Sequence, residues 1–253
     1  MKVVNFTIEI PRYKNYTEVD IVGDSHFGNK YHDNALWELY YTGTLGHEGF
    51  KTAKNTYVIC IGDLMETALK ESLGVQDQNE WIEDQYLWTK RQLQPIKDDG
   101  RLIALVEGNH EKRASRNWFR TTRMLSKELD VPYTYGILLV NLTLKKGDNT
   151  REYKICAHHG YGNARTKGGK MNSIMRMRDI IGDADLYVMG HLHDRMAVTS
   201  PIYIHGEWKD RVFGMTGAYM EYGGYAEDKL YTPPARGSLK AKFHFDIDRV
   251  SAR

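Results

Sequence analysis

Short apolar runs that end abruptly at Gly, Asp, Asn or His recur along the chain. Each run is rich in Val, Ile, Leu or Tyr, and apolar runs of this length bounded by turn-forming residues predict buried β-strands. The runs cover residues 19–22, 57–61, 102–106, 153–157 and 186–189. The sequence therefore predicts a set of strands that are followed at once by polar side chains.

Segments rich in helix-forming residues separate these runs. In residues 80–93, Ile82, Tyr86 and Leu93 recur at the spacing of one helix face. Strands that alternate with helices predict a layered α/β architecture. The expected helices cover residues 34–41, 80–93, 113–129 and 170–181, and Gly182 follows the last of them.

The second half of the chain has a different pattern. Residues 137–144 and 151–157 flank a Lys-Lys-Gly-Asp-Asn turn, which predicts a β-hairpin. Further β-rich stretches follow His193, at residues 196–204, 211–215 and 240–247. We expect them to form a mainly antiparallel sheet that faces the first sheet. The predicted fold class is α/β, with two facing mixed β-sheets flanked by helices, and residues 1–253 are expected to form a single domain.

The composition agrees with this architecture. The 253 residues are 41% hydrophobic and 27% charged, which suits one large domain whose core needs no covalent links. Cys60 and Cys156 lie inside apolar runs, so we expect reduced core thiols. The N-terminal residues lack the features of a signal peptide, and no apolar run is long enough to span a membrane. We expect a cytoplasmic protein with no membrane partner.

Histidine is unevenly distributed in this sequence. Most of the 10 histidines lie in short clusters flanked by Gly, Asp or Asn, close to the ends of expected strands. Ligands commonly bind where strands end at a shared edge of an α/β sheet. Imidazoles combined with aspartate and asparagine oxygens suit Mn, Fe, Co, Ni and Zn, whereas two thiols inside strands do not fit a cysteine-type zinc site. The clustered residues are His26, His110, His158, His159, His191 and His193.

The motifs that carry these residues are weak when each is taken alone. Asp24-Ser25-His26 is typical of many surface turns, and an aspartate after glycine, such as Asp63, commonly caps a helix. Their order is specific: D-x-H, G-D, G-N-H-E, H-H-G and G-H-x-H follow one another. Over residues 18–193 this series resembles the calcineurin-like metallophosphoesterase superfamily. The tail from Tyr225 looks similar to compact phage and prokaryotic members, which are related to DNA-repair nucleases and phosphodiesterases.

The resemblance implies a centre of two divalent transition-metal ions, with Mn expected first and Fe, Ni, Co or Zn as alternatives. A hydroxide that bridges the ions would attack the phosphoester. In such families the residue that corresponds to Asp63 bridges both ions, which agrees with the two oxygens of a carboxylate. By the same resemblance, one ion is bound by Asp24, His26 and His193 and the other by Asn109, His158 and His191.

Four residues in and near these ligand sets need separate arguments. His158 and His159 compete for one ligand position; we choose His158 because it is the first polar residue after the apolar run, and His159 would then face substrate. Glu66 fits either a solvated residue in a first helical turn or a partner of a ligand. His110 belongs to neither ligand set and resembles the family's catalytic histidine, which protonates the leaving group or stabilises its charge.

The residues around the motifs favour a nucleic-acid or nucleotide substrate. The net charge is only +2, but basic stretches with nearby aromatic residues follow two of the motifs, at residues 112–123 and 165–178. Such stretches suit a nucleic-acid strand, although each is also compatible with a solvated helix face. Arg165, in a glycine-rich loop after His159, is the residue that we expect to contact phosphate.

We therefore expect hydrolysis of phosphodiesters of DNA or nucleotides. The alternatives are a small-molecule phosphomonoesterase and a catalytically silent binding module of the same fold. A binding module would be free to lose Asp63, Asn109 or His110, and the chain has all three. The sequence does not define an oligomeric state.

Overall fold

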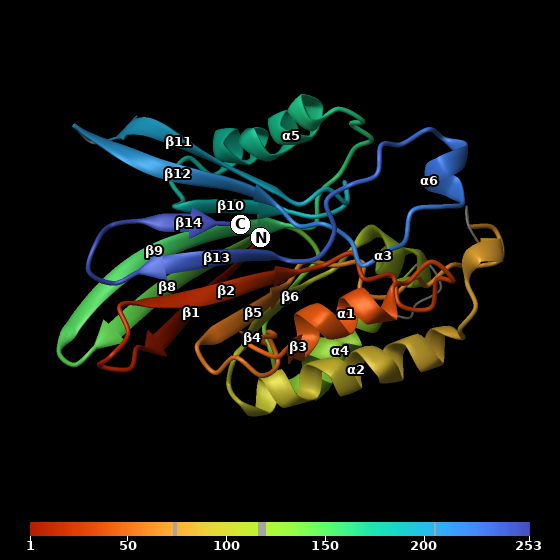
Figure 1. Ribbon diagram of the computed structural model, residues 1–253, viewed down its shortest axis with the longest axis horizontal. Coiled ribbons are helices and arrows are strands. Elements are labelled where there is room, and N and C mark those ends of the chain that lie inside the picture. Colours follow the sequence, from red (N-terminus) through yellow and green to blue (C-terminus); the bar gives the residue numbers. More distant parts are fainter. Residues whose placement is uncertain (73–74, 116–119, 205) are drawn as a thin grey trace.

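Two six-stranded β-sheets face each other, with helices on both outer sides (Figure 1). This computed structural model describes residues 1–72, 75–115, 120–204 and 206–253. A short ribbon of β3 (Gly43–Thr44) and β4 (His47–Glu48) lies outside the two sheets. The predicted fold class, two mixed sheets flanked by helices, is confirmed.

One sheet carries the first three motifs on neighbouring parallel strands. Strand β2 (Tyr16–Val22) pairs with β5 (Thr56–Cys60), β5 pairs with β6 (Leu102–Val106), and β6 pairs with β7 (Tyr133–Thr134). The C-terminal part of the chain adds β13 (Leu239–His244) antiparallel to β2, and β14 (Val250–Ala252) antiparallel to β13. Because parallel strands end at the same edge of a sheet, the loops after β2, β5 and β6 are neighbours.

The other sheet has the strand order β1-β8-β9-β10-β12-β11. Strands β8 (Leu138–Lys146) and β9 (Asn149–His158) form the predicted hairpin, and β9 pairs in parallel with β10 (Leu186–Met189). Strand β10 pairs in parallel with β12 (Glu207–Met215), whose hairpin partner β11 (Met196–Ile204) is an edge strand. Strand β1 (Lys2–Glu9) pairs in parallel with β8 at the opposite edge.

Two expectations about this second sheet are wrong. It is mixed rather than mainly antiparallel, because β1, β9, β10 and β12 all take part in parallel pairs. The stretch expected at residues 240–247 instead forms β13 in the sheet of β2. Strand β1 was not among the expected strands, although Val4, Phe6 and Ile8 alternate with Asn5, Thr7 and Glu9, the pattern of a half-buried strand.

Helices cover the outer face of each sheet (Figure 1). Helices α1 (Asn34–Tyr41), α2 (Ile82–Asp98) and α4 (Thr121–Leu129) cover the sheet of β2, and α5 (Lys167–Ile180) covers the other. No helix in the described part of the chain is long and apolar enough to cross a membrane. The shorter helices are α3 (Asn109–Ser115), α6 (Tyr225–Asp228) and the 3₁₀ turn Val75–Asp77.

The single helix expected over residues 113–129 is two helices in the structure. Helix α3 ends at Ser115 and α4 begins at Thr121. The basic and aromatic residues Arg116, Trp118 and Phe119 of this stretch lie outside the described residues.

Aliphatic side chains fill the space between the sheets. Inward and outward residues alternate along each strand, so that Ile155 and Ala157 of β9 pack in the core between the sheets. The same alternation directs Cys156 of β9 outward towards α5, and Cys60 of β5 outward towards the helices on the other side. Both thiols are buried and unpaired, as expected. This alternation also decides which side chain at the end of β9 points inward.

Candidate metal centre

Five loops bring carboxylates and imidazoles together where the strands of the two sheets end. The loops follow β2, β5, β6, β9 and β10. Three groups of side chains have ligand atoms within 4.8 Å of one another, and Asp63 and His26 each belong to two groups. The groups therefore form one continuous cluster. They are Asp24 with His26 and His193, His26 with Asp63 and His110, and Asp63 with His159 and His191.

The backbone of this cluster is strained. Asp24, His26 and Asp63 have φ angles of 54°, 48° and 49°, and His191 and His193 have φ angles of 68° and 53°. Five of the eight non-glycine residues with positive φ in the described part of the chain thus belong to the cluster. Each costs on the order of 1–3 kcal/mol, and such strain concentrates at functional sites. The loops direct these side chains to a common point at the expense of backbone stability.

Backbone N–H groups hold both aspartates in place. The His191 N–H donates to Oδ1 of Asp24 at 3.0 Å, and the His110 N–H donates to Oδ1 of Asp63 at 2.8 Å. Oδ2 of Asp63 remains directed at the imidazoles, at the centre of the cluster. The distances from this oxygen to Nε2 are 3.2 Å for His159, 3.8 Å for His110 and 3.9 Å for His26.

The hydrogen bonds of His159 explain why the cluster suits a cation. Its Nδ1 lies 2.8 Å from the carbonyl oxygen of Ile61, which can only accept, so Nδ1 carries a proton. Nε2 faces Oδ2 of Asp63 and also Oδ1 of Asn109, which is 2.7 Å away. Burial opposes a second proton on this ring, but the Asp63 carboxylate outweighs burial and raises the pKa of His159 to about 9. A divalent cation bound there would supply the positive charge that the Asp63 carboxylate attracts, and Nε2 of His159 would then stay deprotonated as a ligand.

Glu66 orients the other side of the cluster. Its carboxylate accepts from Nδ1 of His26 at 3.1 Å, which leaves the lone pair of Nε2 free for a metal ion. That Nε2 lies 3.1 Å from Nε2 of His193, which lies 3.3 Å from Oδ1 of Asp24. Glu66 is buried, so the alternative of a solvated helix residue is wrong. Burial opposes its ionisation, but hydrogen bonds with His110 and His26 hold the pKa of Glu66 far below its usual value.

His191 completes the cluster from the loop after β10. Its Nε2 lies 2.9 Å from the carbonyl oxygen of Gly162, so Nε2 carries the proton and Nδ1 keeps its lone pair. The ring lies within ligand range of Asp63 and His159. Gly190 precedes it because a Cβ there would lie 2.4 Å from Oδ2 of Asp24.

The structure corrects the choice between His158 and His159. His158 is the last residue of β9; its Nδ1 accepts the Gly160 N–H at 2.9 Å, and it joins none of the three groups in the described chain. Successive side chains of a strand point to opposite faces. Cys156 points outward, whereas Ala157 and the imidazole of His159 point between the sheets. The expected placement of His158 at the centre is therefore wrong, and the alternation along β9 is the signal that identifies His159.

The choice of His159 over His158 predicts a difference in metal content between two variants. His159→Ala is expected to lose bound metal, because it removes a nitrogen that faces both Asp63 and Asn109. His158→Ala is expected to retain the wild-type content. Elemental analysis of the purified variants measures both. Metal loss in His158→Ala with full content in His159→Ala would contradict the assignment.

The buried carboxylate of Glu111, which the sequence analysis did not identify, joins two of the loops. The Glu111 carboxylate accepts the backbone N–H groups of Asp63, Leu64 and Gly108 at 3.0, 2.7 and 3.0 Å. It thereby ties the loop after β5 to the loop after β6 and holds Asp63 beside Asn109. Its position directly after G-N-H was the signal available in the sequence.

Gly108→Ala is expected to destabilise the fold and to reduce metal binding. A Cβ at this position would lie 2.0 Å from Oδ1 of Asp63 and 2.5 Å from Oε2 of Glu111. Relieving this overlap must displace the loops, and we expect a loss of about 2–3 kcal/mol in the free energy of unfolding. Gly182→Ala is the matched control, because a Cβ there meets nothing within 4 Å. Equal denaturation midpoints for the two variants would refute the tight packing of these loops.

His110 belongs to the cluster through its group with His26 and Asp63, and its side chain is 15% exposed. Its Nδ1 lies 3.0 Å from the backbone carbonyl oxygen of Glu66, and its Nε2 lies 3.8 Å from Oδ2 of Asp63. The structure thus places this imidazole next to the central oxygen. Its catalytic role remains a prediction.

The expected phosphate contact, Arg165, lies on an exposed loop after β9. Its guanidinium lies 5.2 Å from the centre of the Tyr231 ring, so that a cation and an aromatic face are presented together. Lys170 of the same basic stretch is buried in an ion pair with Asp194, 3.1 Å away. This lysine therefore stabilises the loop that follows His193 and does not contact a substrate.

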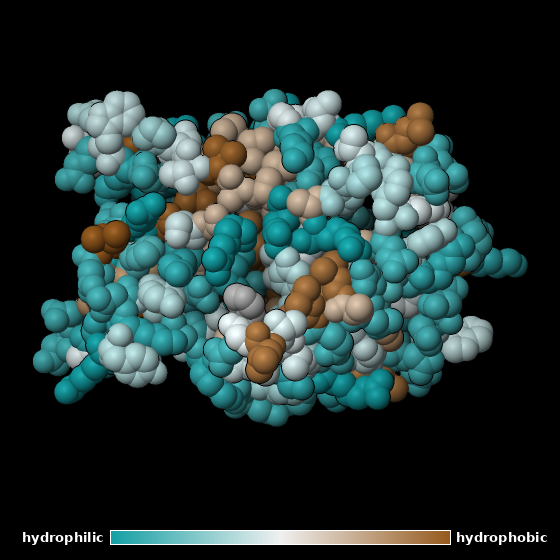
Figure 2. Space-filling view, in the orientation of Figure 1, coloured by the Kyte–Doolittle hydropathy of each residue, from teal (hydrophilic) through white to brown (hydrophobic). Residues whose placement is uncertain are grey.

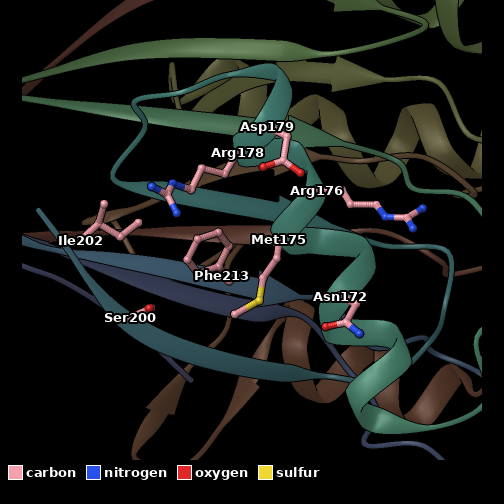
Figure 3. A pocket seen from close by; sticks show the side chains of 8 residues that line it. All are labelled: Asn172, Met175, Arg176, Arg178, Asp179, Ser200, Ile202 and Phe213. Carbon is pink, nitrogen blue, oxygen red and sulfur yellow. The ribbon is translucent and has the colours of Figure 1, made fainter. Parts of the chain in front are cut away.

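The remaining arginines of that stretch line a separate pocket. Arg176 and Arg178 lie on α5 at the edge of a pocket of about 380 Å³ between this helix and the β11–β12 hairpin (Figure 3). Its floor includes Met175, Ile202 and Phe213. Apolar side chains gather beside α5 on a face that is otherwise mainly hydrophilic (Figure 2). No described residue of the pocket belongs to the metal-ligand cluster. The residues of the second basic stretch thus lie in three places: an exposed loop, a buried ion pair and this pocket.

Comparisons with known proteins agree with the order of the motifs. The sequence profile of the calcineurin-like phosphoesterases matches residues 17–195, which include every residue of the cluster and well over half of the chain. A search of curated proteins found no match.

Proposed function

Since the chain belongs to the calcineurin-like phosphoesterase family, we propose that it hydrolyses phosphoester bonds with two divalent metal ions. The observation that carries the proposal is the position of Asp63, whose Oδ2 faces the imidazoles of His26, His110 and His159. Carboxylate, imidazole and amide ligands together suit Mn, Fe, Co, Ni and Zn. Mn²⁺ is the ion that we would test first.

The ligands of each ion come from both sheets. A pair of bound divalent ions lowers the pKa of a coordinated water and neutralises charge on the phosphoryl oxygens. The chain fixes its donor atoms in advance: Glu66 sets the tautomer of His26, and the Ile61 carbonyl sets that of His159. We assign one ion to Asp24, His26 and His193, the other to Asn109, His159 and His191, and Asp63 to both.

His110 is assigned to the departing oxygen of the substrate. The backbone that would direct Asn109 to a metal ion also places His110 in the cluster, because the two residues are adjacent in α3. An imidazole exchanges protons near neutral pH, which suits the protonation of a leaving alkoxide. In this role His110 touches the reacting group but holds no metal ion.

A phosphodiester of DNA or of a nucleotide is the substrate class that we propose. The support is two arginines: Arg113 contacts His110 of the cluster, and Arg165, on the exposed loop that follows His159, lies over the ring of Tyr231. Cations bind the phosphate backbone, and aromatic rings stack on bases. The proposed partner is therefore a nucleic acid or a nucleotide.

A grid of metals and substrates tests the proposal. Purified protein would be assayed with Mn, Fe, Co, Ni and Zn on bis(nitrophenyl) phosphate, nitrophenyl phosphate, and single-stranded and duplex DNA. We expect metal-dependent cleavage, with the diesters preferred. Preference for the monoester would favour a phosphomonoesterase. Metal binding without turnover of any substrate would favour a binding module and refute the proposed hydrolysis.

A further inference from the structure

Arg113 makes an unexpected contact with the proposed catalytic histidine. It lies one helical turn after His110 in α3, and its guanidinium nitrogen Nη2 lies 3.0 Å from Nε2 of His110. Its other terminal nitrogen, Nη1, lies 3.5 Å from Oε1 of Glu66. The Arg113 side chain is 25% exposed, so part of it faces solvent. The sequence placed Arg113 only in a basic stretch.

The chemistry of the guanidinium decides the direction of this hydrogen bond. Arginine has donors and no acceptor, so Nε2 of His110 must accept from Arg113. The other ring nitrogen, Nδ1, faces the carbonyl oxygen of Glu66 at 3.0 Å and therefore carries the proton. The nitrogen that would serve the leaving group is thus covered by Arg113 in this structure. A substrate must displace this contact before His110 can act.

A phosphoryl oxygen is a better partner for this arginine than the imidazole is. Hydrogen bonds between two charged groups are roughly twice as strong as neutral ones, and the planar guanidinium matches the geometry of phosphate. The guanidinium is also close enough for this exchange. It contacts Nε2 of His110, and that nitrogen lies 3.8 Å from Oδ2 of Asp63 at the centre of the cluster.

We propose that Arg113 binds the substrate phosphate, exchanging its contact with His110 for a phosphoryl oxygen. This inference rests on the proposed function for the position of the phosphate. The exchange adds a fixed positive charge on the side of the cluster where the leaving group departs. It also frees Nε2 of His110 only when a phosphate is present. Because Nε2 is the acceptor in the Arg113 contact, it must then take up a proton from solvent before it can donate one to the leaving group.

Calorimetric titration of inorganic phosphate into the Mn²⁺-loaded protein tests the inference without requiring turnover. Arg113→Met is expected to weaken phosphate binding on the order of 10- to 100-fold, the worth of a hydrogen bond between charged groups. Arg113→Lys, which keeps the charge, is expected to recover part of this affinity. Lys127→Met, which removes an exposed charge from α4, is the matched control and is expected to bind phosphate as the wild type does.

The same titrations in a His110→Gln background separate two roles. If Arg113 touches phosphate, Arg113→Met weakens binding in both backgrounds. If Arg113 only positions His110, the effect disappears once His110 is replaced, and the inference is overturned. A loss of Mn²⁺ from both Arg113 variants would also overturn it, because the arginine would then act through Glu66. A wild type that binds phosphate through Arg113 but cleaves no ester would instead refute the proposed function alone.

Discussion

Asp63→Ala is expected to lose both metal ions and at least about a thousand-fold in the rate of phosphoester hydrolysis. Its Oδ2 is the atom on which the imidazoles of both ligand sets converge. Without it, His26 and His159 face each other across a buried space with no negative charge between them. Elemental analysis and the rate on bis(nitrophenyl) phosphate measure the two losses.

Two comparisons make the Asp63 result specific. Asn109→Ala removes a ligand assigned to one ion only, so it is expected to retain more metal than Asp63→Ala. Asp20→Ala is the control for loss of a buried aspartate, because Asp20 contacts Ser238 and Lys240 rather than the cluster. It is expected to lower the free energy of unfolding but to keep both ions. If Asp63→Ala kept the wild-type metal content, the bridging assignment would be wrong.

His110→Gln is expected to slow the cleavage of DNA or alkyl diesters on the order of 10²–10⁴-fold, the typical contribution of a general acid. The variant is expected to keep both metal ions, since His110 is assigned to neither. The loss on bis(nitrophenyl) phosphate is expected to be much smaller, because a nitrophenolate departs without a proton. The ratio of the two losses therefore measures proton donation.

Other roles of His110 predict different ratios. Uniform slowing of both ester types would show that His110 stabilises charge or orders its loop instead of donating a proton. His158→Gln is the control, since this histidine accepts the Gly160 N–H and belongs to none of the ligand groups in the described part of the chain. It is expected to leave both rates close to those of the wild type.

The order of the motifs was enough to predict the fold class and most of the cluster. Motifs such as G-N-H-E report residue types at strand ends, and parallel strands bring those ends together whatever the details of the helices. The motifs do not report side-chain direction. His158 was chosen as the first polar residue after a strand, although the inward positions of β9 continue through Ala157 to His159.

Other features depend on contacts that a linear pattern does not contain. The buried roles of Glu66 and Glu111 arise because loops from separate strands meet around them. Strand β1 pairs with β8, more than a hundred residues away in sequence, so its own pattern does not indicate its place in the sheet. The positive φ angles of Asp24 and the other ligands follow from tertiary packing that overrides local preference.

The division of the ligands between the sheets has a consequence for the order of folding. Asp24 follows β2 in one sheet and His193 follows β10 in the other, so neither sheet contains a complete set for either ion. Contacts between residues so distant in sequence form late, because a long loop must close before they gain any stability. A nascent chain that has not yet reached His193 therefore lacks a ligand of the first ion. Metal uptake should therefore coincide with docking of the two sheets. On unfolding, the metal should be released when the sheets separate, before either sheet unfolds.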